Sequence, residues 1–226
     1  MNQRANIKEA ISDKRNIVKN CVLAPKAVIK RLPRYSRILG ELMTNTESIS
    51  STDLGEQMGI TASQIRQDLS NFGTFGLQGY GYRVKMLHDQ INVILGLGNS
   101  YTMVLVGAGN LGRSISNYIQ SGKSGFDIIA LFDLNPKRLG LKIKNIEIME
   151  FGRLSEFLKE HSVDIGIITT SKNSAQGVAD KLVAGGVKGI WNFSMTDLVV
   201  PDNVVIENVH LSDSLYLLTY QINQTK

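Results

Sequence analysis

The sequence predicts an α/β protein of two domains, a small helical domain with a β-hairpin followed by a larger domain built on a doubly wound parallel sheet. Three observations predict it. Short helical patterns and a glycine-rich hairpin pattern fill residues 25–90. Continuous apolar strands alternate with helices over residues 101–209. The basic charge lies in the first part, since residues 1–90 carry 13 basic and 8 acidic side chains and residues 91–226 carry 12 of each.

This charge asymmetry favours an N-terminal domain that binds an anionic polymer such as double-stranded DNA, and the alternative is a solvated charged face. No apolar run approaches the roughly 18 residues that a membrane span needs. Residues 1–24 form a basic extension without the apolar core of a secretory signal. One cysteine, Cys21, excludes an internal disulfide. The sequence therefore predicts a cytoplasmic protein without a membrane partner.

The first domain, residues 25–90, begins with apolar residues at a helical spacing between Val28 and Leu42. Pro33 interrupts this pattern, and because proline suits the first turn of a helix, the regular helix is expected to start there. Two short helices follow with a turn of about three residues between them, which is typical of a helix-turn-helix. Their expected caps are Ser50 or Ser51, Gly59 and Thr61, and the second of them covers residues 62–72.

The segment GTFGLQGYGYRV after the third helix alternates glycines with aromatic residues and indicates a small β-wing. The order and lengths of these elements predict a winged helix. Residues 91–100, INVILGLGNS, are expected to form a short linker helix that ends at Gly96 or Gly98.

In the second domain the predicted strands are TMVLVG, FDIIALFD, VDIGIITT and VKGIWNF, and the predicted helices are LGRSISNYIQS, LSEFLKEH and SAQGVADKLVAGG. Apolar runs such as IIALF and IGIIT indicate parallel strands that are buried on both faces. Such strands are joined by right-handed crossovers, so residues 101–209 are predicted to form a Rossmann domain.

A glycine pattern marks the turn between the first strand and the first helix of this domain. Gly107, Gly109 and Gly112 form G-x-G-x-x-G, which in this position is typical of a dinucleotide-binding turn. The first glycine permits the tight turn, the second lets the backbone approach a pyrophosphate, and the third lets the helix pack close to the strand. The alternative is that the glycines serve packing only. The expected phosphate-binding residues are Gly107, Ala108, Gly109, Asn110, Leu111 and Gly112.

An acidic residue, Asp133, ends the second predicted strand. There it can accept hydrogen bonds from the adenosine ribose hydroxyls and repel a 2′-phosphate, which favours NAD(H) over NADP(H) as the cofactor. Lys137 and Arg138, just beyond, can reach a phosphate, so the NADP alternative stays open.

No catalytic or metal site is predicted. Residues 100–206 suffice only for the nucleotide-binding layers, and no substrate-binding segment is recognisable. His88, His161 and His210 form no convincing acid–base set, and no metal-ligand spacing is present. The chain is therefore expected not to be an enzyme.

Four motifs together are more specific than either domain pattern. TASQIRQDLSNFGTFG, GYGYRV, VGAGNLG and GIWNFS occur in an order and spacing that strongly resemble the Rex family of redox-sensing transcriptional repressors, from about residue 25 to residue 222. The resemblance implies a homodimer that binds an inverted-repeat operator when NADH is scarce and leaves it when NADH binds. NAD+ would compete for the same site.

For DNA binding, the resemblance implies that residues 62–72 form the recognition helix. Arg66 can contact base edges bidentately or clamp a phosphate, and Gln67 suits adenine. Many family members carry lysine where Gln67 stands, so the base preference there stays open. The alternative for Arg66 is a pair with Asp68 or solvent. The residues expected at DNA are Lys30, Arg31 and Arg34 on backbone phosphates, Ser63, Gln64, Arg66 and Gln67 in the major groove, and Gln78 to Arg83 of the wing in the minor groove.

For the cofactor, Tyr118 matches a family tyrosine near the nicotinamide, and the alternative is a helix tyrosine with a half-buried ring. Thr169 and Thr170 end a predicted strand where it borders the cofactor crevice. Asn192 and Phe193 end the next strand and can line the adenine or nicotinamide side, with core packing as the alternative.

Residues 210–226 are predicted to form a C-terminal helix with an apolar face. In the family this helix is domain-swapped between subunits, and the alternative is a helix that covers its own sheet. The family's interdomain switch pairs an arginine, here Arg37, with an aspartate, for which this chain has His210. Neutral His210 can accept a hydrogen bond but cannot form that salt bridge, and Asp213, one turn further on, can substitute.

Two other functions stay open. One is a small NAD-dependent oxidoreductase with an accessory DNA-binding domain, which turnover of NADH would support. The other is a regulator that holds its dinucleotide permanently and does not sense it.

Overall fold

The computed structural model describes residues 24–73, 76–77, 81–122 and 125–225. The chain divides into two compact units, one up to Asn99 and one from Ser100 onward. Within the described residues, no helix combines the length and the apolar character that crossing a membrane requires.

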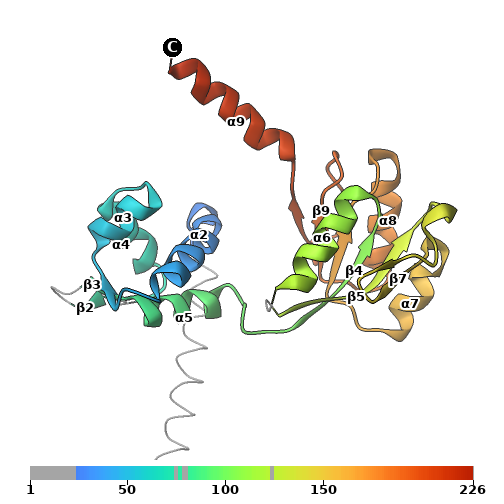
Figure 1. The fold of residues 1–226 in the computed structure, drawn as a ribbon, viewed down its shortest axis with the longest axis horizontal. Coiled ribbons are helices and arrows are strands. Elements are labelled where there is room, and N and C mark those ends of the chain that lie inside the picture. The colour runs from blue at the N-terminus through green and yellow to red at the C-terminus, as the bar shows by residue number, and fades with distance from the viewer. Residues whose placement is uncertain (1–23, 74–75, 78–80, 123–124, 226) are drawn as a thin grey trace, which may run out of the picture. The chain divides into compact units, whose positions relative to one another are not determined.

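The described residues of the first unit form four helices and three short strands. Figure 1 shows how they are arranged. Strand β3 pairs antiparallel with both β1 and β2, so the three strands form one small sheet beside the helices. This arrangement confirms the predicted winged helix. The elements are α2 (Lys26–Leu42), β1 (Ser48–Ile49), α3 (Ser51–Met58), α4 (Ala62–Ser70), β2 (Gly76–Leu77), β3 (Gly81–Arg83) and α5 (Val84–Ile94).

The caps predicted for the helix-turn-helix are confirmed. The Ser50 hydroxyl accepts a hydrogen bond from the Asp53 amide at 3.1 Å, and the Thr61 hydroxyl accepts one from the Gln64 amide at 3.1 Å. Gly59 ends α3 in the left-handed conformation, with φ of 63°. These caps fix where α3 stops and where α4 begins.

Two predicted helix boundaries in this unit are wrong. Helix α2 starts at Lys26 and passes through Pro33, because its buried face runs without a break from Val28 to Leu39 and this packing outweighs the lost backbone hydrogen bond. Of the predicted linker helix over residues 91–100, only residues 91–94 are helical, and they form the end of α5. That helix starts directly after β3, and its buried positions Val84, Leu87 and Ile91 follow a helical spacing.

The second unit is a seven-stranded sheet in the order β10-β9-β8-β4-β5-β7-β6. All neighbouring strands are parallel except the β6–β7 pair, and this order confirms the predicted Rossmann domain. The strands are β4 (Tyr101–Val106), β5 (Phe126–Asp133), β6 (Lys142–Ile143), β7 (Ile146–Glu150), β8 (Ile165–Ile168), β9 (Gly189–Asn192) and β10 (Val205–Asn208). The helices are α6 (Asn110–Ser121), α7 (Leu154–Glu160), α8 (Lys172–Ala184) and α9 (Leu211–Gln224), with 3-10 turns η1 (Pro136–Arg138) and η2 (Phe151–Arg153).

Alternate residues of the central strand β4 enter two different cores. Met103 and Leu105 pack on the side of α6, and Val104 and Val106 pack on the side of α7 and α8 (Figure 1). The sheet is thus buried on both faces, as its continuous apolar strands predict.

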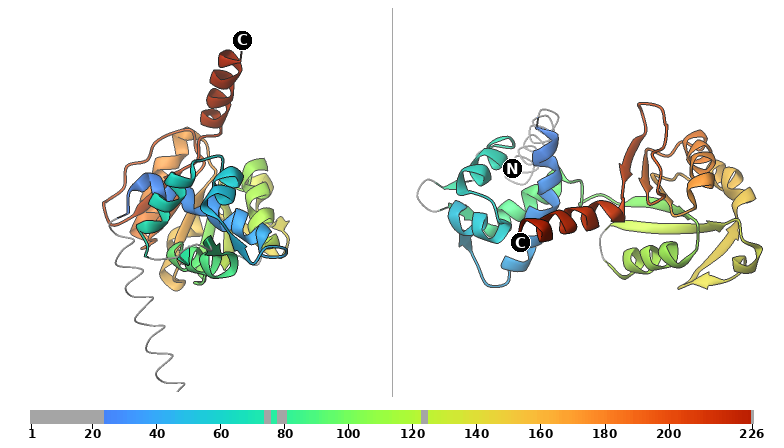
Figure 2. Two further views of the ribbon diagram at one scale, coloured as in Figure 1. Left: turned by 90° about the vertical axis from the view of Figure 1, so that its left-hand side faces the viewer. Right: turned by 90° about the horizontal axis from the view of Figure 1, so that it is seen from above.

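Helix α9 buries none of its residues. Leu211 is 65% and Leu218 51% exposed, and the helix extends away from the sheet of its own unit (Figure 2). The alternative that α9 covers its own sheet is therefore wrong. An apolar helix left this open is a typical protein interaction surface.

Candidate dinucleotide site and DNA-binding surface

The turn between β4 and α6 requires glycine at two of its three positions. Gly107 has φ of 107°, and a Cβ there would lie 2.8 Å from the Thr169 carbonyl. A Cβ on Gly112 would lie 2.1 Å from the Gly107 oxygen. The protein's own packing does not require Gly109, since the nearest atom to an added Cβ would be 3.7 Å away on Arg138. Gly109 instead keeps open the space above the turn.

The N-terminus of α6 faces that space with free backbone donors. The amide of Arg113 makes the first intrahelical bond, to the Gly109 oxygen at 2.9 Å. The amides of residues 110–112 precede it, so helix geometry leaves them available to an anion. The expected residues Ala108, Asn110 and Leu111 lie in or beside this turn, Ala108 buried and the other two exposed.

The turn lies at the point where the strand order reverses. Strand β4 has β5 on one side and β8 on the other, so the ends of β4 and β8 meet there. The Thr169 hydroxyl donates to the Gly107 oxygen at 2.6 Å and so holds the turn itself. The buried Thr170 hydroxyl has no hydrogen-bond partner among the described residues. A buried hydroxyl of this kind is a group that a ligand can satisfy.

Asp133 ends β5 beside the turn and is only 4% exposed. Its Oδ1 accepts from the Asn135 amide at 2.7 Å, and its Oδ2 accepts from Arg138 Nη1 at 3.0 Å. The carboxylate is therefore fixed at the edge of the crevice, with a cation beside it.

Asn192 does not line the crevice as a free group. It is fully buried, and its Nδ2 donates to the Thr196 oxygen and to Asn208 Oδ1, both at 2.8 Å. Its Oδ1 accepts from the amide and the hydroxyl of Ser194. The ring of Phe193 packs edge-on against Trp191, with 4.6 Å between centroids. The alternative of core packing is confirmed for Asn192, whose amide is bonded within the protein. Phe193 is partly buried, and its contact with the cofactor stays a prediction.

Tyr118 lies on α6 with its side chain 79% exposed. The alternative of a half-buried ring is wrong. The ring is available for contact with a ligand or a second chain.

In the first unit, a buried carboxylate joins the recognition helix α4 to α2. Asp68 is fully buried, and both its oxygens are bound by Arg31, from Nε at 2.7 Å and Nη2 at 2.6 Å. The Tyr35 hydroxyl and Gln64 Nε2 complete the cluster at 3.1 and 2.7 Å. Burial would raise the pKa of the Asp68 carboxyl, but hydrogen bonds from Arg31 and Gln64 lower that pKa below its ordinary value of 3.8.

This cluster gives a structural role to two residues that the sequence predicts at DNA, and their contact with DNA stays a prediction. Arg31 and Gln64 were expected at phosphate and at bases, yet both side chains bind Asp68 inside the domain. Sequence spacing cannot reveal this, because Arg31 and Asp68 are 37 residues apart. The alternative that Arg66 pairs with Asp68 is also wrong, since Arg66 Nη1 donates to the exposed Ser51 hydroxyl at 2.8 Å.

The remaining expected DNA contacts are exposed where the structure describes them. Ser63, Arg66 and Gln67 share the exposed side of α4. Lys30, Arg34 and Arg83 are exposed as well, whereas Gln78 lies outside the described residues. Such a set of cations and amides beside a recognition helix can contact phosphates and base edges.

Arg37 and His210 belong to different units. Arg37 is exposed on α2. His210 precedes α9, and its Nε2 lies 3.7 Å from Asp197 Oδ1. Their pairing across a dimer stays a prediction.

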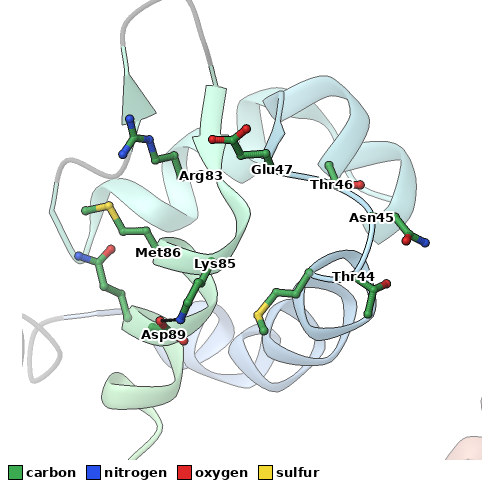
Figure 3. Close-up of a pocket in the computed structure, with 10 residues that line it drawn as sticks. Thr44, Asn45, Thr46, Glu47, Arg83, Lys85, Met86 and Asp89 are labelled. Carbon is green, nitrogen blue, oxygen red and sulfur yellow. Dashed lines mark hydrogen bonds and ion pairs between the residues drawn. The ribbon is translucent and has the colours of Figure 1, made fainter.

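An open groove lies between the turn after α2 and the start of α5 (Figure 3). Lys85 and Asp89, which line it, pair with each other at 2.8 Å. Of the expected site residues only Arg83 is there, and no phosphate-binding turn opens onto the groove, so we assign the dinucleotide site to the second unit. The lining residues are Met43, Thr44, Asn45, Thr46, Glu47, Arg83, Lys85, Met86, Asp89 and Gln90.

Across the described part of the chain, no cluster of three His, Cys, Asp or Glu side chains could hold a metal ion.

The depressed pKa of Asp68 predicts acid sensitivity. A carboxyl with a lowered folded-state pKa stabilises the fold fully above its unfolded pKa of about 4, and this contribution is lost as the pH falls through the folded-state pKa. We therefore expect the melting temperature of the first unit to fall as the pH drops below about 4. Circular dichroism melts over this range measure it, and an Asp68→Asn variant with the same pH profile as the wild type would contradict the assignment.

Known proteins resemble the chain over most of its length. A family model described as a CoA binding domain matches residues 99–196, and one described as the N-terminus of a putative DNA-binding protein matches residues 24–70. The redox-sensing transcriptional repressor Rex of Clostridium botulinum (strain Alaska E43 / Type E3) is 58% identical over 88% of this chain and 96% of that protein. The repressor of the same name from Thermoanaerobacter sp. (strain X514) is 53% identical over 88% of this chain and 89% of that protein.

Solved structures of a Rex-family repressor also resemble the chain over most of its length. The Rex-family repressor RSP in complex with β-NAD+ and operator DNA superimposes with a TM-score of 0.84 at 51% identity, covering 89% of this chain and 94% of that chain. RSP in complex with β-NADH gives a TM-score of 0.83 at 49% identity, covering 89% and 95%. The chain shares two domains in the same order with these proteins, and more than half of its aligned residues are identical in the repressors from C. botulinum and Thermoanaerobacter. It therefore belongs to the Rex family of redox-sensing transcriptional repressors.

Proposed function

We propose that this chain is a homodimeric repressor that binds an inverted-repeat operator and releases it when NADH occupies the second unit. The observation that carries the proposal is the pairing, in one chain, of an exposed recognition surface on α4 with a dinucleotide turn at the sheet's switch point. The relative RSP was crystallised with β-NAD+ and operator DNA together and, separately, with β-NADH. A sensor of this kind needs both sites.

At the cofactor site, the amides of residues 110–112 bind the pyrophosphate and Asp133 binds the adenosine ribose. The buried Thr170 hydroxyl, which has no hydrogen-bond partner among the described residues, follows β8 at the switch point, and we assign it to the dinucleotide. Tyr118, exposed on α6, is the residue we assign to the nicotinamide end. Coenzyme A and NAD share an ADP unit, which accounts for the match to a CoA-binding model.

At the operator, Ser63, Arg66 and Gln67 contact bases, and Lys30, Arg34 and Arg83 contact phosphates. Arg31 and Gln64 position α4 from inside the domain. The exposed apolar face of α9 packs on the partner subunit and links the DNA-binding units to nucleotide occupancy. Arg37 and His210 contribute to this link, with Asp213 as the second acceptor.

The mechanism is linkage rather than catalysis. NADH and the operator favour different arrangements of the dimer, so each weakens the binding of the other by the same factor. A ligand with equal affinity for both arrangements would release nothing. A role as a cytoplasmic regulator rather than an enzyme is supported by the relatives, which are named transcriptional repressors.

The test is operator binding by fluorescence anisotropy at fixed salt, with NADH and NAD+ titrated separately. The probe is an inverted-repeat duplex selected from a random pool by the nucleotide-free protein, and the control is the same duplex with one half-site scrambled. We expect NADH to release the duplex and NAD+ to leave it bound. Release by both or by neither would contradict redox sensing, and steady consumption of NADH would support the oxidoreductase instead.

A further inference from the structure

Arg138 lies between the two parts of the dinucleotide site. Its Nη1 donates to Asp133 Oδ2 at 3.0 Å. Its Nη1, Nη2 and Cζ lie 3.7, 3.8 and 3.9 Å from the position that a Cβ on Gly109 would occupy. The guanidinium therefore adjoins both the residue expected to hold the ribose and the glycine expected to face the pyrophosphate.

The Arg138 guanidinium changes the net charge that a ligand meets at Asp133. A lone carboxylate at this position repels a phosphate on the ribose 2′-oxygen and so rejects NADPH. Here the carboxylate is paired, and the pair carries no net charge. Arg138 uses one nitrogen for Asp133 and keeps further N–H groups, in a planar fork that suits phosphate.

The Arg138 side chain is also partly exposed to solvent. Arg138 is the last residue of η1, and its side chain is 38% exposed, whereas that of Asp133 is 6% exposed. Gly140, two residues on, has φ of 76° and nothing within 4 Å of an added Cβ, so the backbone beyond η1 is uncrowded. A 2′-phosphate that comes to Asp133 thus meets a partly exposed cation that is already bonded to that carboxylate.

We propose that Arg138 is a specificity-determining residue of the dinucleotide site, which narrows the preference for NADH over NADPH by pairing with Asp133 and donating to a ribose 2′-phosphate. The inference rests on the proposed function, because it requires that the site bind NADH. It adds that Arg138 lowers the ratio of the NADPH to the NADH dissociation constant below the value that Asp133 alone would give.

Isothermal titration calorimetry with NADH and with NADPH tests the proposal on the full chain. In Arg138→Gln we expect the ratio of the NADPH to the NADH dissociation constant to rise about tenfold, since only NADPH loses a charge-assisted hydrogen bond. In Asp133→Asn we expect that ratio to fall, because the repulsion is gone and Arg138 is freed. Lys142→Gln is the matched control: it removes the same charge from an exposed residue of β6, which pairs with Glu147 rather than with the end of β7 beside Asp133, and should leave the ratio within about twofold.

Each other outcome is decisive. Equal losses for both dinucleotides in Arg138→Gln would place the guanidinium on the shared pyrophosphate and overturn the proposal. An unchanged ratio, or a wild-type protein that binds NADH but shows no NADPH binding at millimolar concentration, would also overturn it. If the wild type binds neither dinucleotide, the proposed function fails as well, so the two failures are distinguishable. Unchanged far-ultraviolet circular dichroism of each variant shows that the fold is intact.

Discussion

Replacing Arg31 by alanine should destabilise the DNA-binding unit by about 3–5 kcal/mol. The guanidinium supplies two hydrogen bonds to Asp68, which is fully buried, and only Tyr35 and Gln64 remain without it. A buried carboxylate without its cation costs far more than a lost surface pair. Calorimetry resolves the unfolding of this unit, and fluorescence of Trp191, the single tryptophan, follows the second unit as an internal reference.

The matched control is Arg34→Ala on the same helix. Arg34 is exposed, so its loss should change stability by less than about 0.5 kcal/mol while weakening DNA binding and reducing its salt dependence. The double variant Arg31→Met with Asp68→Leu should recover much of the stability, because an apolar pair leaves no buried charge. Equal costs for Arg31→Ala and Arg34→Ala would contradict a structural role for the cluster.

The predictions that succeeded depend on local chemistry. Ser50, Gly59 and Thr61 mark helix ends because a hydroxyl cap or a left-handed glycine acts within a few residues of itself. The G-x-G-x-x-G turn is equally local, and Gly107 and Gly112 occupy positions where a Cβ would clash. Parallel strands are recognisable because burial on both faces demands continuous apolar runs.

The predictions that failed depend on packing between distant segments. Pro33 alone indicates a helix start, but the buried face of α2 carries the helix through it. The short hairpin β6–β7 and the edge strand β10 have too few buried residues to stand out as strands. Each exists because a neighbouring strand pairs with it.

At the DNA-binding surface and the dinucleotide site, the sequence predicts which polar residues are present better than it predicts what each of them binds. Arg31 and Gln64 are polar residues on the expected helices, yet both side chains donate hydrogen bonds to the buried Asp68. Asn192 ends the expected strand, but its side-chain amide is hydrogen-bonded to the loop that follows. A charged or amide side chain in the sequence indicates a group that can bind a ligand. The fold determines whether that group is instead hydrogen-bonded to another residue of the protein.

Replacing Gly112 by alanine should abolish the response to NADH. The added Cβ would lie 2.1 Å from the Gly107 oxygen and 2.8 Å from the Thr169 hydroxyl, so α6 must move away from the turn. That movement withdraws its first amides from the pyrophosphate, and losing two such hydrogen bonds weakens NADH binding about 100-fold. Operator binding should persist, because the first unit has its own core, but NADH should no longer release the duplex in the anisotropy experiment.

Gly177→Ala is the matched control, since it makes the same change within a helix of the same unit. Nothing lies within 4 Å of a Cβ at Gly177 in α8, so alanine there should stabilise the helix by about 0.5–1 kcal/mol and leave NADH binding unchanged. Alanine is also the better helix former at Gly112, which means that a loss of NADH binding there must come from the close approach of helix and turn. If Gly112→Ala still binds NADH normally and is released from the operator by it, the dinucleotide is bound elsewhere and the assignment of this turn is wrong.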